Sequence, residues 1–163
     1  MRNREAVNEQ PLLSLQTTEA ILTASRALLG VVARSVSPAL EFVTLPHFRV
    51  LVVLTGAGPL RMGSLAERMS ANSSTFSRSI DRMVAGGWVE RSPSPGSRRE
   101  VLISATEAGR ALVDEVTERR RHAISEILSR VTPENQRAVL SALEVFSAAA
   151  SEPAVEDLLT LGL

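Results

Sequence analysis

One stretch of the chain restricts the possible folds more than any other, an amphipathic helix predicted to begin at Asn72 and to end at Gly86-Gly87. Its apolar residues recur at helical spacing and share one side of the helix: Phe76, Ile80, Met83 and Val84. The opposite side has only short hydroxyls, two arginines and one aspartate: Ser74, Ser77, Arg78, Asp81 and Arg82. We therefore expect one buried side and one exposed, hydrogen-bonding side.

The segments on either side of this helix predict a winged helix-turn-helix. A short helix is expected at Gly63–Met69, and strands are expected at Trp88–Arg91 and Glu100–Ile103. The loop between the strands is predicted at Pro93–Ser97, with Arg98 and Arg99 where the second strand begins. Two short helices joined by a tight turn allow the second helix to enter a DNA major groove, and the hairpin adds a wing.

Four further helices are predicted around this unit. They are expected at Leu15–Val36, from an N-cap at Thr44 to Gly56, from Ser104 or Thr106 to about Arg130, and from an N-cap at Thr132 to Pro153. The fold class is therefore mainly α with a small β-hairpin wing. We assign residues 45–103 to a winged helix-turn-helix DNA-binding domain and residues 1–44 and 104–163 to a helical dimerisation region. Residues 154–163 fit either a frayed tail or a short packed helix.

The composition excludes several classes of enzyme. The 163 residues include no cysteine, and all 18 basic residues are arginine. Thiolate metal sites, a P-loop lysine and a Schiff-base lysine are therefore absent. The two histidines, His47 and His122, have no serine-histidine-aspartate order beside them. We expect no catalytic residue, no cofactor and no metal site. An enzymatic function would need a cofactor that supplied the chemistry itself.

The apolar segments are short. The longest uninterrupted apolar run is residues 27–33, which is much shorter than a transmembrane helix requires. Glu5, Glu9 and Glu19 precede it, which argues against a signal peptide. The prediction is a cytoplasmic protein with no membrane partner.

Positive charge is concentrated in the predicted DNA-binding domain. Residues 61–99 contain seven arginines against three acidic residues, although the net charge of the chain is zero. Small hydroxyl side chains fit into a major groove, and arginine pairs with guanine there or inserts into a narrow minor groove. The residues predicted to contact double-stranded DNA are Arg61, Asn72, Ser73, Ser74, Thr75, Ser77, Arg78, Arg82, Arg98 and Arg99.

Six short blocks, in order, resemble the successive motifs of the MarR family of bacterial transcriptional regulators. The blocks are Leu45–Leu51, Leu65–Met69, Ser74–Arg78, Asp81–Met83, Gly87–Arg91 and Thr106–Arg110, and the resemblance extends over about residues 15–150. It implies a homodimer in which the first and last helices of both chains interlock. It also implies a repressor that is released from DNA when it binds a small, often aromatic or anionic ligand.

The resemblance also implies roles for individual residues. Ser74, Thr75, Ser77 and Arg78 match the recognition helix, and Arg98 matches the wing arginine. The chain departs from the family pattern at Ser97, where an aspartate usually precedes the paired arginines and holds the wing. A pseudo-palindromic operator with half-sites about 10 base pairs apart is expected for such a dimer.

Several alternatives remain open at this stage. The arginine-rich side could meet an acidic protein partner, which would make the chain a winged-helix protein-interaction module without specific DNA binding. His47 could line a ligand pocket or simply cap the surface, and Asp81 could pair with Arg78 one turn away. On the later long helix, Arg119-Arg120-Arg121 favours solvated ion pairs. Glu118, His122 and Glu126 favour a salt-bridge ladder over a metal site.

Overall fold

The computed structural model describes residues 2–71, 73–94 and 97–150, and the side chains of residues 2–12, 73–74 and 97–99 lie outside that description. The elements follow the order α1 (Arg2–Val36), the 3-10 helix η1 (Ser37–Glu41), α2 (Leu45–Ala57), β1 (Leu60–Arg61), α3 (Met62–Arg68), α4 (Ser73–Ala85), β2 (Val89–Ser94), β3 (Ser97–Ala105), α5 (Glu107–Leu128) and α6 (Pro133–Ala150). The mainly helical fold with a small winged sheet is confirmed.

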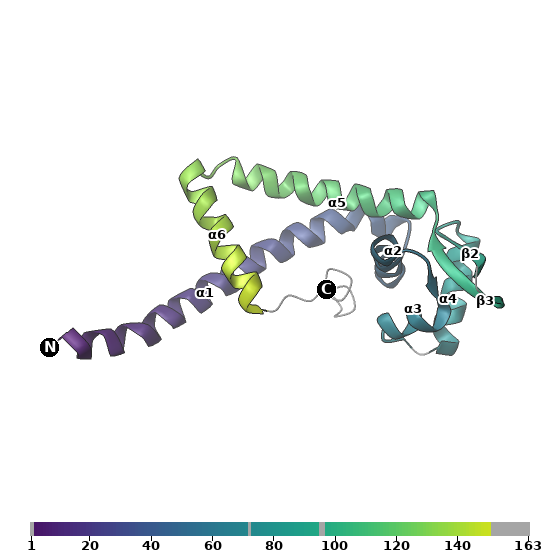
Figure 1. Cartoon of the computed structure of the whole chain (residues 1–163). Helices are drawn as coiled ribbons and strands as arrows, with labels where there is room; N and C mark the ends of the chain where they lie inside the picture. The colour runs from purple at the N-terminus through teal and green to yellow at the C-terminus, as the bar shows by residue number, and fades with distance from the viewer. Residues whose placement is uncertain (1, 72, 95–96, 151–163) are drawn as a thin grey trace.

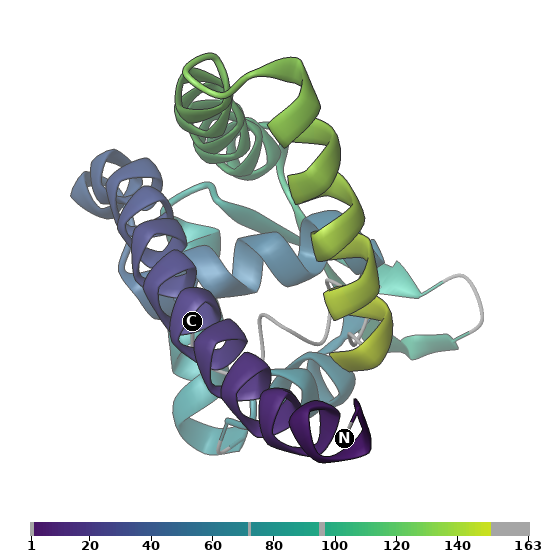
Figure 2. The same cartoon turned by 90° about the vertical axis from the view of Figure 1, so that its left-hand side faces the viewer.

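The long helices extend away from a compact end of the molecule. Figure 1 shows α2, α3, α4 and the strands gathered at one end, while α1 and α5 run outward from it. At the far end of α5 the chain turns and α6 returns toward α1, which Figure 2 shows from the side. Helix α1 packs against α5.

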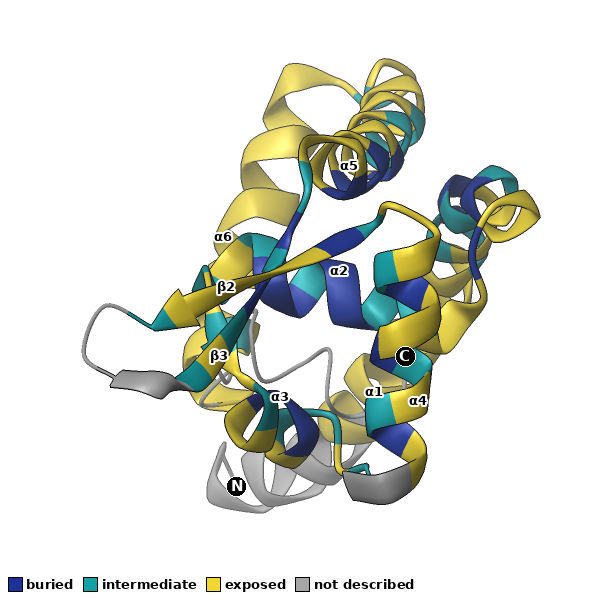
Figure 3. Ribbon diagram, turned by 90° about the vertical axis from the view of Figure 1, so that its right-hand side faces the viewer, coloured by how far each residue is buried: buried dark blue, intermediate teal, exposed yellow. Residues whose placement is uncertain are grey.

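The hydrophobic core of the described residues lies at the compact end. Figure 3 shows the buried residues concentrated where α2, α4, β3 and the first half of α5 meet. The predicted apolar side of α4 contributes Phe76, Ile80 and Met83 to this core. Ala39 of η1 and Val116 of α5 belong to the same cluster. The core therefore extends across both predicted domain boundaries.

The sheet is larger than the predicted hairpin. Its strands follow the order β1-β3-β2, and all pairs are antiparallel. Two-residue β1 was missed because so short a strand leaves no alternating pattern. Pro93, which was expected in the loop, pairs with Val101 and lies beside a register irregularity. Proline is tolerated there because β2 is an edge strand, where a missing ladder donor costs little.

Two of the predicted helix starts are confirmed, and one alternative is wrong. Thr44 caps α2, since its Oγ1 accepts a hydrogen bond from the His47 backbone N–H at 3.4 Å. Thr106 caps α5, and its Oγ1 accepts from the Gly109 N–H at 3.1 Å. The alternative cap at Ser104 is wrong, because Ser104 lies in β3 and donates to Glu90 across the sheet.

Helix α1 begins well before the predicted start at Leu15, because the prediction followed an apolar stripe that the first turns lack. The 29-residue segment Leu13–Glu41 is long and apolar enough, by length and composition, to cross a membrane. An uninterrupted apolar run ends at the first charged residue, whereas an average over 18 residues tolerates up to two of them. Only 11% of its most apolar window is buried within one chain.

Candidate nucleic-acid interface

The exposed side of α4 matches the predicted polar stripe. Thr75, Arg78, Asp81 and Arg82 are exposed, and Ser77 is half-buried. Because Phe76, Ile80 and Met83 on the other side are held in the core, the helix cannot rotate this stripe inward. Figure 3 shows α4 at the edge of the compact end, with exposed residues facing outward.

The end of α4 is fixed by its glycines. The N–H groups of Gly87 and Trp88 donate to the carbonyls of Val84 and Met83 at 3.0 and 2.9 Å. This pair of bonds is a Schellman motif, and it needs a left-handed residue after the helix. Gly87, with φ of 73°, supplies it. Trp88 then packs half-buried against the core, and the chain enters β2.

One edge of α4 is joined to the wing by an ion pair. Asp81 Oδ1 accepts a hydrogen bond from Arg91 Nη2 at 2.6 Å, and both side chains are partly exposed. The predicted pairing of Asp81 with Arg78 is therefore wrong. No local pattern indicates the true partner, because Arg91 comes into range only when β2 folds back along the helix.

The other edge of α4 is joined to α2. His47 Nε2 lies 2.9 Å from Ser79 Oγ, and both side chains are half-buried. Burial lowers the pKa of His47, and the positive charge of nearby Arg82 lowers it further. Sequence reasoning singled out His47 but missed Ser79, which lies at the border between the polar and apolar sides of α4.

Arg61, another predicted DNA contact, lies on β1 at the base of the wing. Its Nη2 is 2.9 Å from Glu100 Oε2 on β3, and its side chain is exposed. The pair joins two neighbouring strands, so part of its role is to hold the sheet. Arg61 is still accessible from solvent.

Several predicted contacts cannot be placed. Asn72 lies outside the described residues, as do the side chains of Ser73, Ser74, Arg98 and Arg99. The backbones of the last four belong to the first turn of α4 and to β3. They remain predictions.

Arg78 and Arg82 have no carboxylate within ion-pair distance in the part of the chain that the structure describes. By contrast, Arg119 and Arg121 of α5 pair with Glu115 and Glu118, as predicted for a solvated helix face. Arginines without a local carboxylate partner can place their full charge and hydrogen-bonding capacity on an anion. The exposed side of α4 can therefore bind a negatively charged surface.

The comparisons with known proteins agree with this arrangement. The sequence profile of the MarR family matches residues 43–101, which include α2, α3, α4 and most of the sheet. The transcriptional regulator PecS of Dickeya dadantii is 30% identical over 145 residues, which are 84% of this chain and 87% of PecS. The chain belongs to the MarR family.

Two further proteins are similar to this chain. The crystal structure of RV1404 from Mycobacterium tuberculosis has 38% sequence identity and a TM-score of 0.74, and the match covers 83% of this chain and 92% of that one. The transcriptional repressor NicR of Pseudomonas putida is 34% identical over 68 residues, which are 42% of this chain and 43% of NicR. PecS and NicR are named as transcriptional regulators rather than enzymes.

Proposed function

We propose that this MarR-family chain is a dimeric, sequence-specific DNA-binding transcriptional regulator. The observation that supports this most strongly is the exposed side of α4, beside a β-ribbon, where Arg78 and Arg82 have no carboxylate partner among the described residues. A slim polar helix face fits a major groove, and an adjacent hairpin reaches the backbone or the minor groove beside it. Arg78 would pair with base edges, and the wing arginines Arg98 and Arg99 would contact the flanking groove.

The proposed homodimer is supported by the exposed apolar surface of α1 and α6. No residue of α6 is buried within the single chain, although Leu140, Leu143, Val145 and Phe146 are apolar and 48–68% exposed. Between α1 and α6 lies a cleft of about 1030 Å³, lined on the α1 side by residues such as Ile21. Covering so much apolar surface with a second copy would remove it from water.

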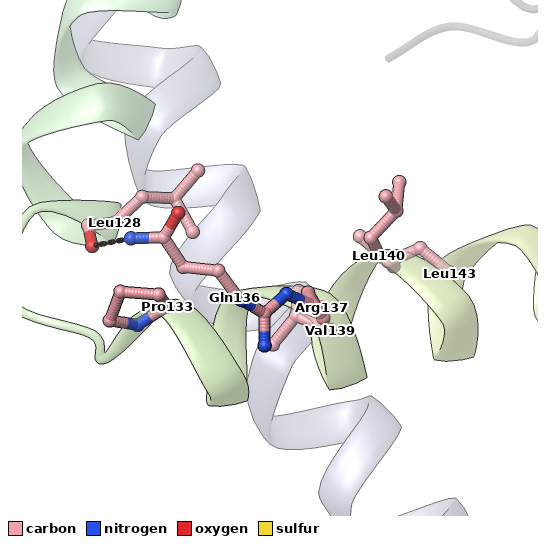
Figure 4. A pocket seen from close by; sticks show the side chains of 7 residues that line it. All are labelled: Leu128, Pro133, Gln136, Arg137, Val139, Leu140 and Leu143. Carbon is pink, nitrogen blue, oxygen red and sulfur yellow. Dashed lines mark hydrogen bonds between the residues drawn. The ribbon is translucent and has the colours of Figure 1, made fainter.

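The corner between α5 and α6 adds to this apolar surface. A hollow of about 490 Å³ lies at this corner. Figure 4 shows the residues that line it, among them Leu128, Pro133, Val139, Leu140 and Leu143. Gln136 Nε2 donates to the Leu128 carbonyl at 2.9 Å and so closes the end of α5. The hollow is therefore built on a fixed corner, which gives a partner helix a defined surface to pack against.

We further propose that the protein is a repressor released by a small aromatic or anionic ligand, and that it acts in the cytoplasm. NicR is named a repressor, and the family resemblance implies ligand release. A ligand would act by binding more tightly to a conformation in which the two α4 helices no longer match the half-sites.

A gel-shift comparison tests the DNA-binding function. Promoter DNA next to the gene and a random duplex of equal length are titrated with the protein at matched salt. We expect the promoter to bind more tightly, because base contacts add to phosphate contacts. Equal binding, or none, at every salt concentration would instead favour the winged-helix protein-interaction module.

A further inference from the structure

The two edges of the exposed side of α4 are held differently. The edge at Asp81 is tied to the wing through Arg91. The edge at Ser79 and Arg82 faces α2, where the His47 ring is hydrogen-bonded to Ser79. Ser79 and Arg82 are one helical turn apart and are therefore neighbours on the surface of α4. His47 thus lies at the border of the proposed DNA-binding surface, on the side away from the wing.

We propose that His47 and Arg82 together form a binding site for a DNA backbone phosphate, and that His47 gains a proton when the phosphate binds. This inference rests on the proposed function, since it requires α4 to lie in a major groove. The phosphate backbones border that groove, so the edges of an inserted helix are where phosphates approach.

The charges around His47 favour an anion. Arg82 is exposed, and in the described part of the chain no carboxylate pairs with it or with His47. Asp81, the nearest acidic residue along α4, is engaged with Arg91 on the opposite edge. The His47 ring is bonded to Ser79, one turn from Arg82, and the Arg82 charge acts on it, so an arginine and an imidazole from two different elements lie near one another at this edge. Such a pair can hold a phosphate oxygen by charge-assisted hydrogen bonds.

The free protein holds His47 in its neutral form near pH 7. Burial is the larger cause that lowers its pKa, and the positive charge of Arg82 on α4 lowers the pKa further. The elements that pack against α2 are η1, β3 and α5, and none of their acidic residues is a cause of this shift: Glu41, Glu100, Glu107, Asp114, Glu115, Glu118 and Glu126. A phosphate beside Arg82 would offset the arginine charge and favour the imidazolium. By linkage, protonation of His47 must then strengthen DNA binding.

A role for His47 in effector binding has less support. The α1–α6 cleft and the hollow at the α5–α6 corner, both described above, are not lined by His47. Its hydrogen bond instead runs to the helix that presents the DNA-binding surface.

The test measures how the affinity for DNA depends on pH. The full-length protein is titrated with a fluorescent duplex of arbitrary sequence, about 20 base pairs long, at constant ionic strength from about pH 8 to about pH 5.5. An arbitrary sequence is sufficient because a phosphate contact does not depend on the bases. The variants are His47→Gln, which keeps a group able to bond Ser79 but does not titrate, and His122→Gln as the matched control. His122 is exposed on α5, close to Glu126.

We expect the wild type to bind more tightly as the pH falls, by up to about tenfold for each unit by which DNA raises the pKa of His47. His122→Gln should behave like the wild type, and His47→Gln should lose this gain. The readout is the difference between variants, because the α-amino group also titrates in this range. Circular dichroism at both pH limits confirms that each variant is folded.

The outcomes separate the inference from the proposed function. If wild type and His47→Gln show the same pH dependence while both bind DNA, the phosphate site is wrong and the proposed function stands. If the wild type binds neither this duplex nor the promoter DNA at any pH, both are overturned. As a further arm, inorganic phosphate is added without DNA, and the His47 ring is followed by NMR. A shift in its titration with phosphate alone, equal to that with DNA, would assign the site to a free anion and contradict the proposal.

Discussion

At the scale of single residues, the structure separates arginines that hold the fold from arginines that are available to a partner. Arg61 and Arg91 pair with Glu100 and Asp81 within the sheet and between the sheet and α4. Arg78 lies on the exposed side of α4, and the described residues offer it no carboxylate. The two groups should respond differently to substitution.

We expect Arg78→Ala to weaken binding to the cognate operator by about 1–3 kcal/mol and to relax sequence preference, because a bidentate arginine-guanine pair is lost. The measurement is the dissociation constant for the operator and for single-base variants of it, at fixed salt. Arg121→Ala on α5 is the control, since Arg121 pairs with Glu118 far along the sequence from α4. Unchanged discrimination in Arg78→Ala would remove this arginine from base recognition.

Asp81→Asn tests the link between α4 and the wing. Because the ion pair with Arg91 is partly exposed, its loss should cost at most about 1 kcal/mol of folding stability. The wing would be held less firmly against α4. We therefore expect the free energy of DNA binding to fall by more than the free energy of unfolding. Denaturant unfolding and DNA titration are compared with Glu115→Gln, which breaks the pair with Arg119 on α5 and should leave DNA binding unchanged.

The pH dependence of stability follows from His47. Its pKa in the folded protein is lowered by burial and by Arg82, so below its ordinary value of 6.5 the unfolded chain binds more protons than the folded one. Stability should therefore be fully present above that value and fall as the pH drops through it toward the lowered pKa. Urea unfolding of the wild type and His47→Gln across this range measures the effect, which should be smaller in the variant.

At the scale of elements, the first turn of α5 is fitted closely to the end of α4. Thr106 Oγ1 donates to the Gly87 carbonyl at 2.7 Å, and the Thr106 N–H donates to the Trp88 carbonyl at 3.1 Å. One turn further on, Gly109 is buried against Trp88 and Leu51. The long helix and the DNA-binding unit are therefore connected by a rigid contact.

Gly109→Ala should destabilise the protein by about 1–3 kcal/mol, because the added methyl group would overlap the Trp88 carbonyl oxygen and lie 2.9 Å from Leu51 Cδ2. Gly63→Ala on α3 is the matched control. A methyl group there meets nothing within 4 Å, so this variant should keep or slightly gain stability. Thermal unfolding of both variants decides the point, and equal stabilities would contradict the proposed overlap.

At the scale of the whole molecule, α1 and α6 expose apolar side chains that a second copy of the chain would cover. We expect Leu143→Asp to convert the dimer to monomers and to abolish operator binding, since two half-sites would no longer be held together. Sedimentation measures the mass. Val101→Asp on β3 places the same charge at another exposed apolar residue and should leave the dimer intact. A wild type that sediments as a monomer at micromolar concentration would overturn the proposed assembly.

The sequence by itself determined features that depend on neighbouring residues. The two sides of α4, the cap at Thr44 and the helix end at Gly87 were all predicted, because helical spacing, capping side chains and left-handed glycine act within a few residues. Local rules failed where no stripe or alternation existed, as in the first turns of α1 and in β1.

Only the tertiary structure decided which side chains meet across elements. Asp81 with Arg91, His47 with Ser79 and Gly109 with Trp88 are each brought together by folding. Each pair joins two segments, and the sequence pattern that predicts the helix or strand of one segment does not involve the other segment. The physical reason is that a contact between distant residues depends on how whole elements pack, and the packing is set by the shared core rather than by either local sequence.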